Sequence, residues 1–177
     1  KRLLDILFSI TAMIILSPLV ILVTLIIFFI DGKPIFFVQE RPGLNSRIFK
    51  MIKFRTMTLN SPDYDKDDKE RITKLGSFLR SLSIDELPEF YNVLKGDMSI
   101  VGPRPLLVEY LSLYSNFQKR RHEVKPGITG WAQINGRNAI EWDDKFKLDI
   151  WYIENQSTFL DLKIIFKTFL SVLLRKN

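Results

Sequence analysis

One run of 25 residues, from Ile6 to Ile30, contains no charged side chain and is dominated by Ile, Leu, Val and Phe. A straight helix of this length would measure roughly 37 Å at about 1.5 Å per residue, enough to cross a hydrocarbon core of about 30 Å. The run is too long for the apolar core of a signal peptide, which has about 7 to 15 residues. We therefore predict that this segment is retained and lies in a lipid bilayer.

Ser17-Pro18 stands at the midpoint of this run. Proline removes a helical hydrogen bond and clashes with the preceding turn, so a kink is expected there. One alternative is a spanning helix with a tolerated proline. The other is a hairpin that enters the bilayer and returns to the same face, which the positive residues on both flanks (Lys1, Arg2 and Lys33) mildly favour. The residues leave both alternatives open.

The overall composition narrows the class of protein. A chain of 177 residues suits one domain. Its 26 Lys and Arg against 20 Asp and Glu give a net charge of +6, which suits nucleic acid, anionic lipid or phosphorylated small molecules. The absence of cysteine excludes disulfides, thiolate metal sites and thiol nucleophiles.

The remaining sequence alternates short strand and helix patterns. Residues 34–57 predict two strands around a Pro-Gly turn, with Lys53 on the second strand. Apolar spacing predicts helices over residues 74–83 and 85–95, and residues 106–124 are expected to continue as a helix after Pro103-Arg104-Pro105. The final stretch, residues 159–176, has a broad apolar face and a narrow cationic stripe. This pattern favours a helix in the membrane interface over a core helix.

Asp85 and Glu86 lie side by side in "RSLSIDELPEF", residues 80–90. The simple interpretation is a helix start, because Ser83 and Glu86 have the spacing of a capping box. The alternative is a reacting centre. Adjacent helical positions point about 100° apart, so one carboxylate could face a substrate while the other faces a metal ion. Arg80 lies just upstream, and a helix N-terminus attracts anions.

Two further arginines stand in rigid sequence contexts, Arg104 between two prolines and Arg137 inside a glycine-rich loop. Their planar guanidinium groups suit phosphate oxygens. Together with the paired carboxylates they suggest phosphoryl chemistry with Mg²⁺, cations that stabilise the developing charge, and a carboxylate nucleophile. The single histidine, His122, excludes a histidine metal site. We interpret the basic run around it, residues 119–125, as a solvated or lipid-headgroup face.

Three stretches, "KFRTM" (53–57), "RSLSIDELPEFYNVLKGDMSIVGPRPLL" (80–107) and "RHEVKPGITGWAQINGRN" (121–138), closely resemble the bacterial sugar transferase family. More narrowly, the chain is similar to the small monotopic phosphoglycosyl transferases. The resemblance extends in order over the whole chain. It implies an α/β, mostly helical fold with a short β-hairpin and interfacial amphipathic helices. It also implies a re-entrant membrane hairpin over residues 1–31, broken at Ser17-Pro18, and a catalytic domain over residues 32–177.

The same resemblance implies a location and an activity. The protein would rest on the cytoplasmic face of the bacterial inner membrane. There it would transfer a sugar-1-phosphate from a UDP-sugar to polyprenyl phosphate and release UMP. The stretch "INGRNAI" (134–140) resembles members that use N-acetylated amino sugars. Expected partners are the UDP-sugar, polyprenyl phosphate, membrane lipids and downstream glycosyltransferases, and no nucleic acid.

Residue roles follow from the resemblance by position. Asp85 matches the nucleophile that forms a covalent phosphosugar intermediate, and Glu86 matches its partner, a Mg²⁺ ligand. The basic positions expected to hold phosphates are Lys53, Arg80, Arg104 and Arg137. From the residues themselves, positive charge near Asp85 is expected to keep it ionised. Two alternatives stay open: a non-catalytic membrane module that binds polyprenyl phosphate or anionic lipid, and a membrane-tethered nucleic-acid binder, which the poor interleaving of aromatic and basic residues disfavours.

Overall fold

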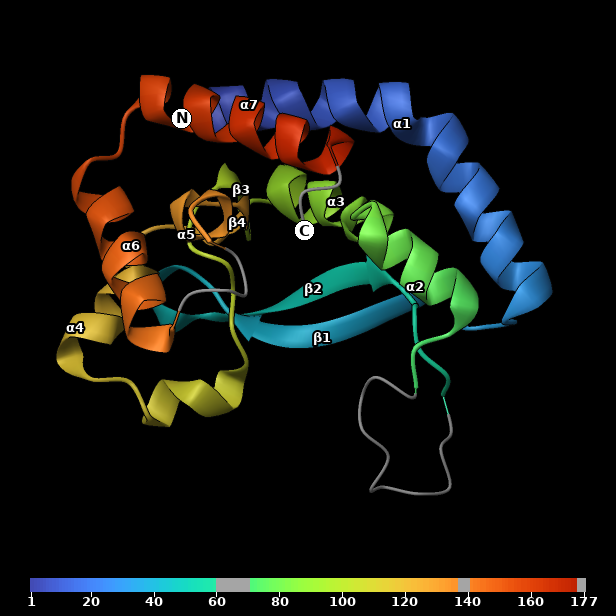
Figure 1. Ribbon diagram of the computed structural model, residues 1–177, viewed down its shortest axis with the longest axis horizontal. Helices are drawn as coiled ribbons and strands as arrows, with labels where there is room; N and C mark the ends of the chain where they lie inside the picture. The colour runs from blue at the N-terminus through green and yellow to red at the C-terminus, as the bar shows by residue number, and fades with distance from the viewer. Residues whose placement is uncertain (60–70, 137–140, 175–177) are drawn as a thin grey trace.

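The computed structural model describes residues 1–59, 71–136 and 141–174. Within these residues the chain is mostly helical, with two small sheets below the long first helix (Figure 1). The elements, in order, are α1 (Arg2–Ile30), β1 (Phe36–Pro42), β2 (Ile48–Phe54), α2 (Lys74–Ser81), α3 (Glu89–Lys95), β3 (Ser99–Val101), α4 (Asn116–Lys119), β4 (Gly127–Thr129), α5 (Trp131–Ile134), α6 (Trp142–Glu154) and α7 (Thr158–Leu173).

The apolar run forms α1, a single bent helix rather than a hairpin with two separate arms, so the predicted re-entrant hairpin is not confirmed (Figure 1). Pro18 lies inside it and lacks the N–H that would bond to the carbonyl of residue 14. The hydroxyl of Ser17 donates to that Ile14 carbonyl at 2.8 Å. The Ser-Pro pair therefore bends the helix while its side chain satisfies the carbonyl that proline leaves free.

Both ends of α1 are attached to the rest of the molecule. At its start, the Asp5 carboxylate is buried and accepts hydrogen bonds from the Ser99 hydroxyl (2.9 Å) and the Ile100 N–H (3.1 Å) of β3. At its end, the Arg55 guanidinium donates to the backbone carbonyls of Asp31 (2.6 Å) and Gly32 (2.8 Å). The middle of α1 lies away from these anchors, and most of its large apolar side chains are exposed.

The two strand pairs differ in direction. β1 and β2 form the predicted antiparallel hairpin, whereas β3 and β4 are short and parallel. One core cluster lies between β2, α3, β3, α6 and α7, and a second packs the end of α1 against β2 and α2. The predicted helix end at Lys95 is confirmed, because Gly96 adopts the left-handed conformation (φ 98°) that terminates a helix.

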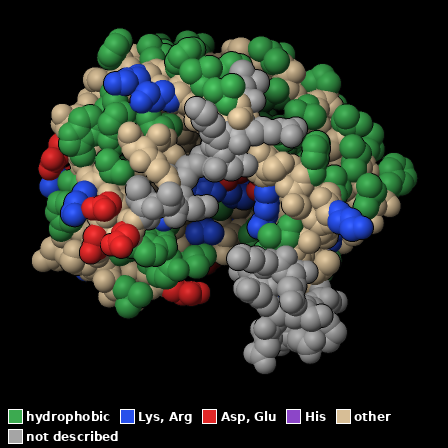
Figure 2. Space-filling model, viewed as in Figure 1, with side chains coloured by type: hydrophobic (Ala, Val, Ile, Leu, Met, Phe, Trp, Pro, Cys, Tyr) green, Lys and Arg blue, Asp and Glu red, His purple; other side chains and the backbone are tan. Residues whose placement is uncertain are grey.

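Helix α7 has two different faces. Its Leu160 and Ile164 are buried in the core, whereas Phe159 and Phe166 are 80% and 62% exposed. The early turns of α1 and α7 line one small cavity, so the two helices are neighbours there. Figure 2 shows apolar side chains along the edge where Figure 1 places these helices. The helix thus has both a core face and an apolar outer face. Membrane contact through the outer face of α7 stays a prediction.

The prediction of one helix over residues 106–124 is wrong. The segment forms a 3-10 helix (Val108–Ser112), then α4, then a second 3-10 helix (Arg120–His122). Ser115 interrupts it because it starts a new helix: its hydroxyl accepts from the N–H of Gln118 (3.2 Å), whose side chain accepts from the Ser115 N–H (2.9 Å). This is a complete capping box.

Candidate active site

Asp85 and Glu86 lie in a 3-10 helix (Ile84–Glu86) between α2 and α3. The capping-box interpretation of Ser83 is wrong. Ser83 adopts a left-handed backbone conformation (φ 56°) and makes no side-chain cap hydrogen bond. The Glu86 carboxylate instead turns toward two cations, which attract it more strongly than a backbone N–H would.

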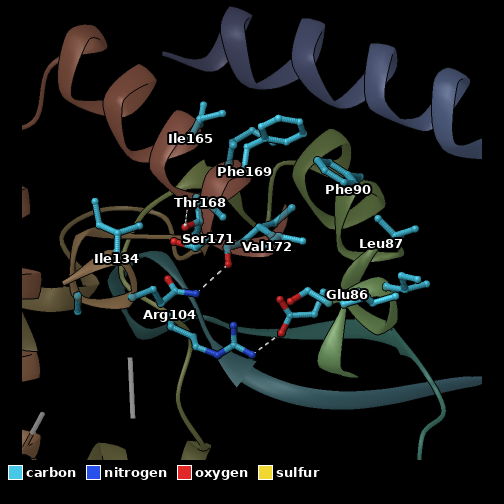
Figure 3. A pocket seen from close by; sticks show the side chains of 18 of the residues that line it. Glu86, Leu87, Phe90, Arg104, Ile134, Ile165, Thr168, Phe169, Ser171 and Val172 are labelled. Carbon is cyan, nitrogen blue, oxygen red and sulfur yellow. Dashed lines mark hydrogen bonds and ion pairs between the residues drawn. The ribbon is translucent and has the colours of Figure 1, made fainter. Parts of the chain in front are cut away.

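The Glu86 carboxylate binds Lys53 and Arg104 through the same oxygen, Oε1. The Lys53 ammonium lies 2.8 Å away. The Arg104 guanidinium also donates a hydrogen bond to this oxygen (Figure 3). Burial alone would raise the pKa of Glu86, but Arg104 and then Lys53 lower it to about 2. Glu86 is therefore ionised at every pH at which the protein is expected to work.

The Asp85 carboxylate is only 8% exposed, and its environment differs from that of Glu86. Burial, and then the negative charge of Glu86, raises the pKa of Asp85 above its ordinary value. Lys53, Arg80 and Arg104 act in the opposite direction without cancelling the rise. Desolvation and the adjacent carboxylate, which the sequence-based argument left out, therefore outweigh the three cations. Ionisation of Asp85 at neutral pH stays a prediction.

A third carboxylate, Glu89, joins the site and was missed from the sequence. It is 2% exposed, and its Oε1 lies 3.0 Å from the Lys53 ammonium. Burial, and then the charge of Glu86, raises the pKa of Glu89 to about 7, although Lys53 acts against the rise. Its position three residues after Glu86 was the available signal, because such residues are neighbours on a helix surface.

The predicted phosphate-binding residues are distributed as follows. Lys53 and Arg104 meet at Glu86, as described. Arg80 donates a hydrogen bond of 2.8 Å to the Thr56 hydroxyl and is one of the cations that lower the pKa of Asp85. Arg137 lies outside the described residues. The structure thus brings three of the four basic residues to the carboxylate pair.

The run at residues 119–125 is not uniformly the solvated face that we predicted. Arg121 and His122 are 4% and 7% exposed. Arg121 donates to the Asp149 carboxylate at 2.8 Å, a buried ion pair. His122 Nδ1 lies 3.2 Å from the Gly43 carbonyl, which can only accept, so this nitrogen carries the hydrogen. Burial, and then the charge of Arg121, lowers the pKa of His122 to about 4.

A cavity of about 780 Å³ adjoins the carboxylate pair. Glu86 and Arg104 line its polar end, and Figure 2 shows basic and acidic side chains gathered in a hollow of this face. Apolar residues of α3 and α7, including Phe90, Ile165 and Phe169, surround the opposite side (Figure 3). Phe8, Leu16 and Leu19 of α1 also belong to its wall. The apolar helix α1 and two charged residues of the site, Glu86 and Arg104, therefore line the same cavity.

The residues present fit a Mg²⁺ ion that is bound together with a substrate. Among the described residues, no group of three or more His, Cys, Asp or Glu could hold a metal alone. Mg²⁺ commonly uses one or two carboxylates plus substrate phosphates and water. The hydrogen bonds from Lys53 and Arg104 both go to Glu86 Oε1, which leaves Oε2 and the adjacent Asp85 as the carboxylate oxygens for such an ion.

A long apolar helix, a buried carboxylate pair and the cations that bind it therefore meet in one part of the molecule. Comparison with known proteins identifies the class. Residues 1–175 match the bacterial sugar transferase family. The chain therefore belongs to this family and is a sugar-phosphate transferase, which confirms the resemblance found from the sequence.

Three relatives illustrate the match. The "uncharacterized sugar transferase EpsL" of Bacillus subtilis is 53% identical, over all of this chain and 89% of its own length. The "undecaprenyl-phosphate galactose phosphotransferase" of Salmonella typhimurium is 39% identical, over all of this chain but 41% of its own length. The "UDP-N-acetylgalactosamine-undecaprenyl-phosphate N-acetylgalactosaminephosphotransferase" of Aeromonas hydrophila is 40% identical, over 98% of this chain and 43% of its own length. The chain thus spans most of EpsL but less than half of the other two.

Proposed function

We propose that this protein transfers a sugar-1-phosphate from a UDP-sugar to polyprenyl phosphate through a covalent intermediate on Asp85. The observation that carries the proposal is the shared cavity. It joins Glu86, the neighbour of Asp85, and the cation Arg104 to the apolar helix α1. Two of the relatives are named as acting on undecaprenyl phosphate with galactose or N-acetylgalactosamine, which supports the same chemical class of acceptor here.

The proposed reaction has two balanced steps. In the first, an Asp85 carboxylate oxygen attacks the sugar-bound phosphorus, the bond to the UMP oxygen breaks, and UMP leaves with that electron pair. In the second, a polyprenyl phosphate oxygen attacks the same phosphorus, the bond to Asp85 breaks, and the free carboxylate is restored. A raised pKa makes the Asp85 carboxylate a more basic nucleophile than an exposed aspartate.

The other residues stabilise charge during these steps. Lys53 and Arg104 already lie at Glu86 and would face the diphosphate of a donor in the cavity, where guanidinium and ammonium groups suit phosphate oxygens. When bound at Glu86 and Asp85, Mg²⁺ would neutralise the negative charge of the donor diphosphate. Glu86 stays ionised and holds the two cations beside Asp85.

We further propose that α1 is re-entrant, so that the protein is monotopic on the cytoplasmic face of the inner membrane. Both ends of the bent helix are hydrogen-bonded to one globular body, at Asp5 and at Asp31, which supports insertion from a single side. The arrangement also suits the acceptor. Moving a lipid of about 50 carbons into water would cost on the order of 40 kcal/mol, so the enzyme must reach the lipid in its membrane.

For the donor, we propose an N-acetylated amino sugar, on the resemblance of residues 134–140 to members that use such sugars. The name of the Aeromonas relative includes N-acetylgalactosamine, whereas the Salmonella name includes galactose. A panel of UDP-sugars that covers glucose, galactose and their N-acetylated amino forms would rank the donors by the rate of UMP release.

The test of the proposed function is UMP release by the purified protein in nanodiscs, with the donor panel, Mg²⁺ and polyprenyl phosphate. We expect multiple turnovers only when polyprenyl phosphate is present, and none with Asp85→Asn. Glu86→Gln should lower kcat by about 100-fold or more, because it removes the charge that holds two cations. Full activity of Asp85→Asn would contradict the role of Asp85 as the nucleophile. No UMP release by the wild type with any donor would support the alternative, a non-catalytic lipid-binding module.

A further inference from the structure

We infer that Glu89 is a positioning residue for the transferase reaction, acting through Lys53. This inference rests on the proposed function and assigns a role to a side chain that the two-step scheme does not use. Three elements meet at the site: Lys53 comes from β2, Glu86 from the 3-10 helix, and Glu89 from the first turn of α3.

The Lys53 ammonium is held between two carboxylates. Its Nζ lies 2.8 Å from Glu86 Oε1 and 3.0 Å from Glu89 Oε1. A lysine side chain has a flexible stem of four carbons and a compact charge, so a single acceptor leaves the position of the ammonium poorly fixed. Two acceptors on different elements restrict the ammonium to one place. The ammonium has three N–H donors. It donates one hydrogen bond to Glu86 and lies in ion-pair contact with Glu89, so a donor remains for a phosphate oxygen.

Glu89 itself is too deeply buried to touch a substrate. Its side chain is 2% exposed, whereas those of Lys53 and Glu86 are 15% and 17% exposed, and Glu86 lines the cavity. A buried carboxylate is unfavourable without a partner, and Lys53 is the cation paired with it at hydrogen-bonding distance. Glu89 therefore acts behind Lys53, and its effect on the reaction passes through the position of that ammonium.

The geometry makes a specific demand on this position: an oxygen acceptor directed at Lys53. Glutamine supplies such an oxygen with the same shape, whereas methionine fills similar space without one. Glu89→Gln should therefore preserve positioning, and Glu89→Met should abolish it. A purely structural role would not separate these two variants in kcat once both are shown to be folded.

The experiment measures kcat and KM for UMP release by the full chain in nanodiscs, for the wild type, Glu89→Gln and Glu89→Met. Glu40→Gln, the same change at an exposed carboxylate, is the matched control. We expect Glu89→Met to lose at least tenfold in kcat with less than threefold change in KM for the UDP-sugar. Glu89→Gln should retain at least one third of the wild-type kcat, and the control should match the wild type.

A second pair of variants tests whether the effect passes through Lys53. In a Lys53→Met background, adding Glu89→Met should change kcat by less than twofold, because the residue to be positioned is already absent. The double variant Lys53→Met with Glu89→Met replaces a buried ion pair with apolar groups. It is therefore expected to fold even if Glu89→Met alone does not. Thermal unfolding of each variant identifies the folded ones.

The outcomes are distinguishable. Three results would each overturn the role of Glu89 while leaving the transferase intact. The first is a wild-type kcat in folded Glu89→Met, and the second is an equal loss of kcat in Glu89→Gln and Glu89→Met. The third is a further large loss of kcat when Glu89→Met is added to Lys53→Met. If the wild type itself releases no UMP from any donor, the proposed function fails, and the role of Glu89 within it fails with it.

Discussion

The Arg121 guanidinium donates a hydrogen bond of 2.7 Å to the backbone carbonyl of Arg104. The same nitrogen donates to the buried carboxylate of Asp149 at 2.8 Å. Arg104, which stands between Pro103 and Pro105, in turn donates a hydrogen bond to Glu86. A buried ion pair between α6 and the 3-10 helix Arg120–His122 therefore supports the backbone that carries an active-site cation.

Asp149→Ala is expected to destabilise the protein by about 3–5 kcal/mol, because it leaves the Arg121 charge buried and unpaired. Arg121→Met combined with Asp149→Leu should recover most of this loss, since no buried charge then remains. UMP release should nevertheless stay low in the double variant, because the Arg104 carbonyl has lost its donor. Denaturant unfolding and the UMP assay check the two effects separately. Wild-type kcat in the double variant would show that Arg104 needs no such support.

Ser17→Ala is expected to lower stability by about 0.5–1.5 kcal/mol, because the Ile14 carbonyl loses the hydrogen bond of the Ser17 hydroxyl. In a Pro18→Ala background the backbone N–H of residue 18 returns and can bond to the same carbonyl. The effect of Ser17→Ala should therefore be clearly smaller there. Thermal unfolding of the four proteins in one detergent measures this coupling, and equal effects of Ser17→Ala in both backgrounds would contradict it.

The proposed topology is open to cysteine labelling, because the chain contains no cysteine of its own. One variant carries a cysteine ahead of Lys1, and another carries Lys33→Cys just after α1. A re-entrant helix predicts that a membrane-impermeant maleimide labels both from the cytoplasmic side and neither from the periplasmic side. Met13→Cys, within the apolar run, should resist the reagent from both sides. Labelling of the first two cysteines from opposite sides would mean that α1 spans the membrane.

His122 gives a pH dependence whose sign can be derived. Its pKa is lowered to about 4 in the folded protein, against about 6.5 for an unperturbed histidine. Between these values the unfolded chain binds more protons, so this contribution to stability falls as the pH falls from about 6.5 toward 4. Between pH 6.5 and 4.5 the contribution of His122 to the free energy of unfolding falls by about 2 kcal/mol.

His122→Gln keeps a donor for Gly43 but does not titrate, so it should lose less stability than the wild type between pH 6.5 and 4.5. Asp149 and Glu89, whose pKa values are raised, act with the opposite sign but are present in both proteins and cancel in the comparison. Denaturant unfolding of both proteins at the two pH values measures the difference. An equal loss of unfolding free energy in the wild type and in His122→Gln would mean that His122 is not held neutral.

Local patterns in the sequence predicted much of the fold. The apolar run gave α1, the Pro-Gly turn gave the β1–β2 hairpin, and Lys95-Gly96 gave the end of α3. Two serines show the limit of such patterns. Ser83 and Ser115 both have capping-box spacing, but only Ser115 forms the box. At Ser83 the capping box does not form, because the Glu86 carboxylate binds Lys53 and Arg104, which are distant in the sequence.

The same limit applies to burial. Arg121 and His122 stand in a basic run that indicates a solvated face, yet Asp149 and Gly43, far along the chain, hold both inside. The raised pKa of Asp85 likewise follows from desolvation, which spacing does not reveal. Arg80 and Arg104 could be predicted from their sequence contexts, and the family resemblance added Lys53. For Glu89 the only sequence signal was its spacing from Glu86, and its contact with Lys53 appears only in three dimensions.

The most direct test of the central claim is mass spectrometry of the intact protein mixed with its UDP-sugar and Mg²⁺ in the absence of polyprenyl phosphate. The account predicts a mass increase of one sugar-phosphate, located on Asp85 by peptide mapping, lost when polyprenyl phosphate is added, and absent in Asp85→Asn. No adduct with a donor that supports turnover, or an adduct on another residue, would contradict a covalent phosphosugar on Asp85.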